Sequence, residues 1–169
     1  MKKNVPVVLS IAGSDSGGGA GIQADIKTIT ALGGFVMTAV TALTAQNSLT
    51  VAGVHKLPPS FVADQIRVTL EDLGADAVKT GMMADAPIIE AAADVLDSMA
   101  SDFPWVIDPV MVSTNKDRLL DEDAVSALKD RLVLKAALTT PNMAEAELLT
   151  GLAVDSADAM EAAGRALVE

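Results

Sequence analysis

Residues 11–28 read IAGSDSGGGAGIQADIKT, and this stretch joins an apolar segment to one with the spacing of an amphipathic helix. The apolar segment Val5–Ala12 predicts a strand, and Ile22–Leu32, which is followed by Gly33-Gly34, predicts a helix. Glycines at 13, 17, 18, 19 and 21 carry no side chain, so their main-chain N–H groups can approach a bound molecule closely. The stretch therefore predicts a strand, a loop and a helix, with a site for a polar small molecule at the loop.

The spacing of the loop excludes three common glycine-loop motifs. A Walker A loop needs a glycine before Lys27-Thr28, and Ile26 stands there. A dinucleotide fingerprint lacks its third glycine, because Ile22 and Ala24 occupy the two possible positions. Asp15 stands where the serine of a nucleophile elbow is required. Two interpretations remain: a small-molecule loop of another kind, or a loop whose glycines only cap the helix.

The composition indicates one globular domain and excludes several classes of function. The chain has 169 residues, half of them apolar, which is enough for a buried core. A net charge of −11, with 3 Phe and 1 Trp, argues against a nucleic-acid partner. The chain has no cysteine and one histidine, His55, so disulfides and thiolate or multi-histidine metal centres are excluded, and His55 has no evident catalytic partner. No apolar run is long enough to span a membrane, and we expect a cytoplasmic protein.

Apolar runs and helical patterns alternate along the rest of the chain. This alternation predicts an α/β fold in which helices cover both faces of a parallel sheet of buried strands. The predicted strands after the first are Phe35–Thr41, Val51–Leu57, Ala75–Lys79, Trp105–Pro109 and Ala137–Thr140. The predicted helices after the first are Ser60–Leu73, Pro87–Met99, Asp121–Leu134 and Ala144–Leu149, and a further helical pattern starts at Asp155-Ser156.

Ligands of parallel sheets bind at the carboxyl ends of the strands. Several polar or small residues directly follow predicted strands, so the topology predicts that they share one rim of the sheet. These segments are Gly13, Thr41–Gln46, Gly81-Met82, Asp108–Met111 and Pro141-Asn142.

The motifs on this rim resemble those of the hydroxymethylpyrimidine and phosphomethylpyrimidine kinases of thiamine biosynthesis. The matching segments are AGSDSGGGAGIQAD (12–25), TALTAQN (41–47), KTGM (79–82), DPVM (108–111) and TPNMAE (140–145). The resemblance runs from Val5 to Glu169 and implies a ribokinase-like, three-layer α/β/α fold with a mainly parallel sheet. It also implies ATP and Mg²⁺ as cofactors, and phosphorylation of the aminopyrimidine's hydroxymethyl group and then of the monophosphate.

The resemblance implies a substrate site lined by Gly13, Asp25, Gln46, Met82 and Val110. The Gln46 amide has an acceptor and two donors, which suits the amino group and neighbouring ring nitrogen of an aminopyrimidine. Met82 and Val110 would form apolar walls. Structural interpretations stay open: Gln46 as a loop residue bonded to backbone, Met82 as part of the core, and Asp25 as a carboxylate favoured near the positive end of a helix.

On the nucleotide side, the resemblance implies that Asn142 and Glu145 organise phosphate and magnesium, and that Asp108 and Glu145 lie at the metal. Magnesium prefers oxygen ligands and keeps several waters, so such residues often act through water. The structural interpretations are a turn aspartate at Asp108, and a helix cap formed by Asn142 with Glu145.

The chain departs from the family pattern in two places. Lys116 stands where family members carry a glycine, and a lysine with positive φ is strained, so we expect a rearranged loop there. The family continues beyond the position of Glu169 with a Gly-Thr-Gly-Cys-type anion hole and the catalytic base. The resemblance thus implies that residues 1–169 are the N-terminal portion of one domain, with a truncated sheet and no catalytic residue of their own. We expect this polypeptide to be inactive as a kinase and to self-associate.

Two other functions remain open beside a pyrimidine kinase. One is a pyridoxal kinase-like enzyme, although Gln46 within Thr-Ala-Gln-Asn favours the pyrimidine. The other is a ligand-binding or assembly module without catalysis. The partners implied by the resemblance are the aminopyrimidine, ATP and a second copy of the chain in a dimer.

Overall fold

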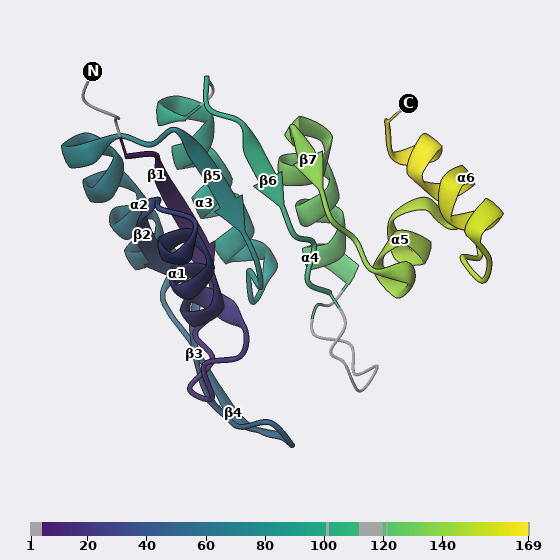
Figure 1. Ribbon diagram of the computed structural model, residues 1–169, viewed down its shortest axis with the longest axis horizontal. Helices are drawn as coiled ribbons and strands as arrows, with labels where there is room; N and C mark the ends of the chain where they lie inside the picture. The colour runs from purple at the N-terminus through teal and green to yellow at the C-terminus, as the bar shows by residue number, and fades with distance from the viewer. Residues whose placement is uncertain (1–4, 101, 112–119, 121, 169) are drawn as a thin grey trace.

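A five-stranded parallel sheet forms the centre of the protein (Figure 1). The computed structural model describes residues 5–100, 102–111, 120 and 122–168. The spatial order of the strands is β2 (Phe35–Val40), β1 (Val7–Ala12), β5 (Ala77–Thr80), β6 (Trp105–Ile107) and β7 (Leu138–Thr139). Every neighbouring pair is parallel. The predicted α/β fold with a mainly parallel sheet is confirmed.

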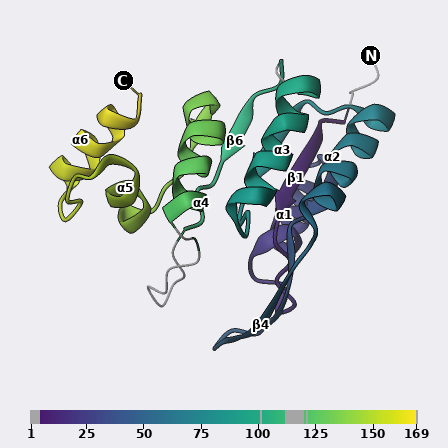
Figure 2. The same ribbon diagram turned by 180° about the vertical axis from the view of Figure 1, so that it is seen from behind.

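Helices lie on both faces of this sheet, as the alternation of patterns predicts. Helix α1 (Gly21–Ala31) packs on β1 and β2 on one face, whereas α2 (Pro59–Leu73), α3 (Ala86–Met99) and α4 (Glu122–Ala127) lie on the other (Figures 1 and 2). The buried side chains of the sheet and these helices form the main core, which includes Leu9, Ile11, Ile66, Val78, Ile89, Leu96 and Ile107. Beyond β7, α5 (Met143–Thr150) packs against α6 (Ala157–Val168).

The direction of the chain across the sheet changes between β1 and β5. From β1 the chain passes through α1 to β2 on one side, and from β5 it passes through α3 to β6 and onward to β7 on the other. Ser10 and Lys79 are paired across β1 and β5, so the loops that follow these two strands emerge side by side. Such a switch point at the carboxyl ends of the strands is where open α/β sheets bind ligands.

The predicted strand Val51–Leu57 exists, but its predicted place in the buried parallel sheet is wrong. It forms β4 (Val51–Lys56), which pairs antiparallel with β3 (Ala42–Gln46) in a separate two-stranded sheet. All residues of β4 are exposed. The segment 47–50 is too short for the crossover that a parallel neighbour needs, so the two strands can pair only as a hairpin. Residues 42–46, expected to be rim loop, are therefore a strand.

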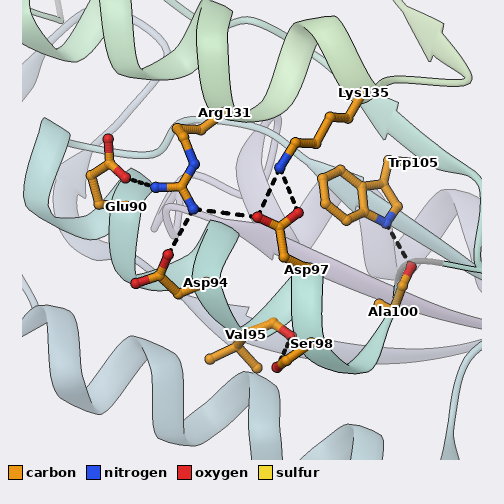
Figure 3. A network of polar contacts seen from close by, with 9 residues as sticks. All are labelled: Glu90, Asp94, Val95, Asp97, Ser98, Ala100, Trp105, Arg131 and Lys135. Carbon is orange, nitrogen blue, oxygen red and sulfur yellow. Dashed lines mark hydrogen bonds and ion pairs between the residues drawn. The ribbon is translucent and has the colours of Figure 1, made fainter.

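The predicted helix Asp121–Leu134 is only partly α-helical. After α4 the chain forms a π-helical turn, η1 (Leu128–Leu132), and a 3₁₀ turn, η2 (Val133–Lys135); Asp121 lies outside the described residues. Side chains of these turns form ion pairs with α3 (Figure 3): Arg131 with Glu90, with Asp94 at 2.6 Å and with Asp97 at 3.3 Å, and Lys135 with Asp97 at 2.6 Å. Leu128, Leu132 and Val133 are buried beside them. A regular helical period in the sequence does not predict this combination of ion pairs and buried side chains.

Candidate functional site

A cavity of about 530 Å³ lies at the switch point between β1 and β5. Its lining includes each residue predicted to contact the substrate, and these come from different elements. Gly13 follows β1, Asp25 lies in α1, Gln46 ends β3, Met82 follows β5 and Val110 follows β6. The fold thus brings together residues that are far apart in the sequence, while their roles toward a ligand remain predictions.

Gly13 and Gly21 allow the loop, α1 and the end of β5 to approach one another closely. The Gly13 N–H donates to the Met82 carbonyl at 3.1 Å, and the Gly13 carbonyl accepts from the Ile22 N–H at 3.0 Å. A Cβ at Gly13 would collide with Met82 Cε, and one at Gly21, whose φ is +57°, would collide with the Gly13 carbonyl. Backbone packing beside the cavity therefore requires glycine at Gly21, whereas a side chain at Gly13 would displace the end of the Met82 side chain.

Asp15 organises the glycine loop from within. Its carboxylate accepts hydrogen bonds from the N–H groups of Gly17 at 2.8 Å, Gly19 at 2.9 Å and Ala20 at 2.8 Å. Burial acts to raise the pKa of Asp15, but the main-chain hydrogen bonds together outweigh it and hold the pKa below its ordinary value. Two of the glycine N–H groups that were predicted for a ligand, those of Gly17 and Gly19, are thus bound by the carboxylate of Asp15, which was not predicted as a site residue.

A charged cluster crosses the cavity from α1 to β6. Lys79 Nζ lies 3.1 and 3.2 Å from the two carboxylate oxygens of Asp25 and 3.7 Å from Asp108 Oδ2. Asp25 also accepts a 2.6 Å hydrogen bond from Ser10 Oγ. The Asp25 carboxylate therefore binds side chains of the sheet, and this argues against the interpretation that it only stabilises the N-terminus of α1.

Lys79 was not predicted as a site residue, although the sequence holds a signal for it. In β5 the neighbouring Val78 and Thr80 are fully buried, so the intervening Lys79 must face the other side of the sheet. A lysine between two buried strand residues, paired with Ser10 of β1, indicates a polar site on that face.

Gln46 is held by its main chain, which leaves its side chain for the cavity. The Gln46 N–H donates to Ser16 Oγ at 2.8 Å, and the same hydroxyl donates to the Gln46 carbonyl at 2.7 Å. Within the part of the chain that the structure describes, the side-chain amide of Gln46 forms no hydrogen bond. Asn47 Oδ1 accepts from the N–H groups of Leu49 and Thr50, which shapes the adjoining hairpin turn.

Asn142 and Glu145 form a capping box at the start of α5 and do not line the cavity. Asn142 Oδ1 accepts from the Glu145 N–H at 3.0 Å, and Glu145 Oε2 accepts from the Asn142 N–H at 2.9 Å. Glu145 is 3% exposed, and its Oε1 accepts from the Met111 N–H at 3.2 Å, which ties the loop after β6 to α5. The structure thus confirms the helix-cap interpretation of this pair, and its role toward phosphate stays a prediction.

Asp108 lines the cavity, and Thr140 Oγ1 lies 3.4 Å from its Oδ1. Among the described residues, no three acidic or histidine side chains are grouped so as to hold a metal ion. A magnesium ion that is held mainly by phosphates and water needs only one or two carboxylates, and Asp108 fits this lesser requirement. The predicted rearrangement at Lys116 lies outside the described residues. His55, on exposed β4, does not line the cavity.

Comparison with known proteins gives one consistent result. The profile of the phosphomethylpyrimidine kinase family matches residues 15–169. The chain is 48% identical over 160 residues to the hydroxymethylpyrimidine/phosphomethylpyrimidine kinase of Mycobacterium leprae, covering 95% of the chain and 57% of that protein. It is similar to the crystal structure of phosphomethylpyrimidine kinase from Clostridium difficile 630, with a TM-score of 0.90, 39% identity, and coverage of 96% of this chain and 70% of that one.

A pyridoxal kinase is also similar in structure. The Staphylococcus aureus pyridoxal kinase in complex with ADP matches with a TM-score of 0.86 and 35% identity, over 98% of this chain and 60% of that one. The chain therefore spans about three fifths of the length of the Mycobacterium leprae kinase and of this pyridoxal kinase. No helix in the described part of the chain has the length and apolar character needed to cross a membrane.

Proposed function

We propose, from the premise that this chain belongs to the phosphomethylpyrimidine kinase family, that it forms the substrate-binding part of a kinase. The complete reaction is transfer of the terminal phosphoryl group of ATP to the hydroxymethyl group of 4-amino-5-hydroxymethyl-2-methylpyrimidine, and then to the resulting monophosphate. The observation that carries the proposal is the convergence of Asp25, Gln46 and Met82 on one cavity at the switch point of the sheet.

The chemistry of the cavity suits an aminopyrimidine. The Gln46 amide can accept a hydrogen bond from the exocyclic amino group and donate one to the adjacent ring nitrogen. Met82 and Val110 provide apolar surface for the faces of the ring, and Asp25 provides an acceptor for the hydroxymethyl group. A pyridoxal ring would not present the same paired donor and acceptor to Gln46, so the pyrimidine is the favoured substrate.

Asp108, Asn142 and Glu145 are proposed to serve ATP and Mg²⁺. Asp108 faces the cavity, and Glu145 joins the loop after β6 to the N-terminus of α5, where main-chain N–H groups favour negative charge. Bound magnesium would neutralise phosphate charge, and these residues would orient its waters or the phosphates.

An ATP-dependent enzyme of this kind is expected in the cytoplasm, as a dimer. Residues 1–169 are proposed to belong to a single domain, since the main core runs from Leu9 to Leu149.

Calorimetric titration of the chain with the hydroxymethylpyrimidine tests the proposal. Gln46→Leu is expected to weaken binding by about 1 to 3 kcal/mol, because the polar edge of the ring would be buried without partners. Gln46→Glu, which keeps the size but lacks the amide donors, should also weaken binding. Pyridoxal, titrated in parallel, should bind less tightly to the unsubstituted chain. Unchanged pyrimidine affinity in Gln46→Leu, with the variant folded by circular dichroism, would contradict the assignment.

A further inference from the structure

Lys79 is the only cationic side chain in the cavity lining among the residues that the structure describes. The charged side chains that share the lining with it are all carboxylates: Asp15, Asp25 and Asp108. An anionic ligand would therefore meet net repulsion in this cavity unless a cation receives its charge. This asymmetry makes Lys79 the residue on which binding of an anion depends.

The hydrogen bonds of Lys79 leave donor capacity for such a ligand. An ammonium group has three N–H donors. The two oxygens of Asp25 accept from Nζ on one side, while the 3.7 Å separation from Asp108 Oδ2 is too long for a hydrogen bond and leaves an electrostatic contact only. The Lys79 side chain is 23% exposed, so its head group retains access to the cavity.

The surroundings of Lys79 also favour this role. Gly81 is the first residue after β5, which contains Lys79, and a Cβ at Gly81 would come within 3.2 Å of Lys79 Nζ. The glycine therefore keeps space beside the ammonium group. Nζ lies between Asp25, which faces the proposed pyrimidine site, and Asp108, which faces the proposed metal site. A phosphate attached to a bound pyrimidine would have to lie between these two ends.

The two substrates of the proposed function differ in one respect that Lys79 can detect. The hydroxymethyl compound is uncharged at this position, whereas a phosphate monoester carries about −1.5 to −2 charges at pH 7. We propose, on the basis of the function proposed above, that Lys79 is a specificity residue for the second substrate and that its ammonium group binds the phosphate oxygens of the pyrimidine monophosphate. The terminal phosphate of ATP is the other possible source of the same chemistry, and the experiment must separate the two.

The test is calorimetric titration of three ligands into the chain: the hydroxymethylpyrimidine, its monophosphate and ATP. Lys79→Gln keeps an N–H donor for Asp25 but removes the charge, and Lys79→Arg keeps the charge. We expect Lys79→Gln to weaken monophosphate binding at least tenfold more than it weakens hydroxymethylpyrimidine binding. Lys79→Arg should recover most of the monophosphate affinity. Lys56→Gln is the matched control, because it removes another lysine–aspartate ion pair, 3.0 Å from Asp85, outside the cavity.

The outcomes distinguish this inference from the function on which it rests. Equal losses for both pyrimidines in Lys79→Gln would overturn the inference and assign Lys79 to support of Asp25. A loss confined to ATP would also overturn it. If the unsubstituted chain binds neither pyrimidine, the proposed function itself fails, and the inference fails with it. If Lys79→Gln does not fold, Lys79→Arg provides the test. A folded Lys79→Arg variant that binds the hydroxymethylpyrimidine tightly but does not bind the monophosphate would show that a positive charge at this position is not sufficient, and would contradict the inference.

Discussion

Asp15 stabilises the glycine loop through main-chain hydrogen bonds that only an ionised carboxylate can make in full. Since the pKa of Asp15 is lower in the folded chain than its ordinary value of 3.8, the stabilisation is complete above that value. It is lost as the pH falls through the lower pKa of the folded state. Asp15→Asn is expected to lower the free energy of unfolding at pH 7 by about 1 to 3 kcal/mol, because it replaces one acceptor oxygen with a donor group.

Denaturant unfolding measured from pH 7 down to pH 2 checks this expectation. The difference between the unsubstituted chain and Asp15→Asn should shrink as the pH falls below about 4. Asp72→Asn is a suitable control, because Asp72 is exposed on α2. A difference between Asp15→Asn and the unsubstituted chain that stays constant down to pH 2 would contradict the ionic role of Asp15.

At the residue scale, the sequence predicted which residues meet at the cavity better than it predicted their contacts. Gly13, Gln46 and Met82 line one cavity, which agrees with the rule that the carboxyl ends of parallel strands meet at one rim. Asp25 also lines it, but it lies in α1 and was assigned only from the family resemblance. The partners of Asp25, and the use of the loop N–H groups by Asp15, depend on side-chain packing in three dimensions. Such contacts leave little trace in residue spacing.

At the scale of elements, Arg131 binds the π-helical turn to α3 by ion pairs with Glu90, Asp94 and Asp97 (Figure 3). Arg131→Met would leave these acidic side chains close together without their shared cation. We expect the free energy of unfolding to fall by about 1 kcal/mol at low salt, since the pairs form a network and Arg131 is partly buried.

The salt dependence of Arg131→Met distinguishes an electrostatic loss from a packing loss. At about 1 M salt the Debye length is about 3 Å, so the stability deficit of the variant should become smaller. Arg165→Met removes an isolated, exposed pair with Glu161 and should cost only about 0.3 to 0.5 kcal/mol. A deficit in Arg131→Met that does not depend on salt would mean that the aliphatic stem, and not the charge, holds the turn.

Elements with strong periodicity and clear ends were predicted well, and those set by tertiary contacts were not. The predicted helix Pro87–Met99 lies within α3, which begins at Ala86. The preceding residue, Asp85, is the N-cap, and its side chain accepts a hydrogen bond from the Ile88 N–H. The π turn escaped prediction, because its irregular period reflects simultaneous burial of Leu128, Leu132 and Val133 beside the ion pairs with α3. Hairpin β3–β4 could have been recognised from the short segment 47–50, which rules out a parallel crossover.

At the scale of the whole molecule, the cavity is made by two parts that differ in their expected stability. The rigid part is the sheet, where β1 has hydrogen-bonded neighbours on both sides. The other part is the β3–β4 hairpin, a separate two-stranded sheet that contributes Thr44, Gln46 and Val54 to the lining. Isolated two-stranded hairpins are marginally stable in water. The hairpin is attached near its base by hydrogen bonds from the Ser14 N–H to the Ala42 carbonyl and from Thr44 Oγ1 to the Ser14 carbonyl.

Hydrogen exchange should therefore reveal two levels of protection in the free chain. Amides of β1 and β5 should exchange slowest, because their opening requires disruption of the main core, whereas amides of β4 should exchange much faster. Saturation with the hydroxymethylpyrimidine should slow exchange in the hairpin, because the ligand would contact the hairpin and the sheet together. At a ligand concentration of about 100 times Kd, mass action stabilises the bound state by about 2.7 kcal/mol against any opening that releases the ligand. Exchange in α6, which does not line the cavity, should change least. Slower exchange on ligand addition in α6 but not in the hairpin would place the ligand outside this cavity.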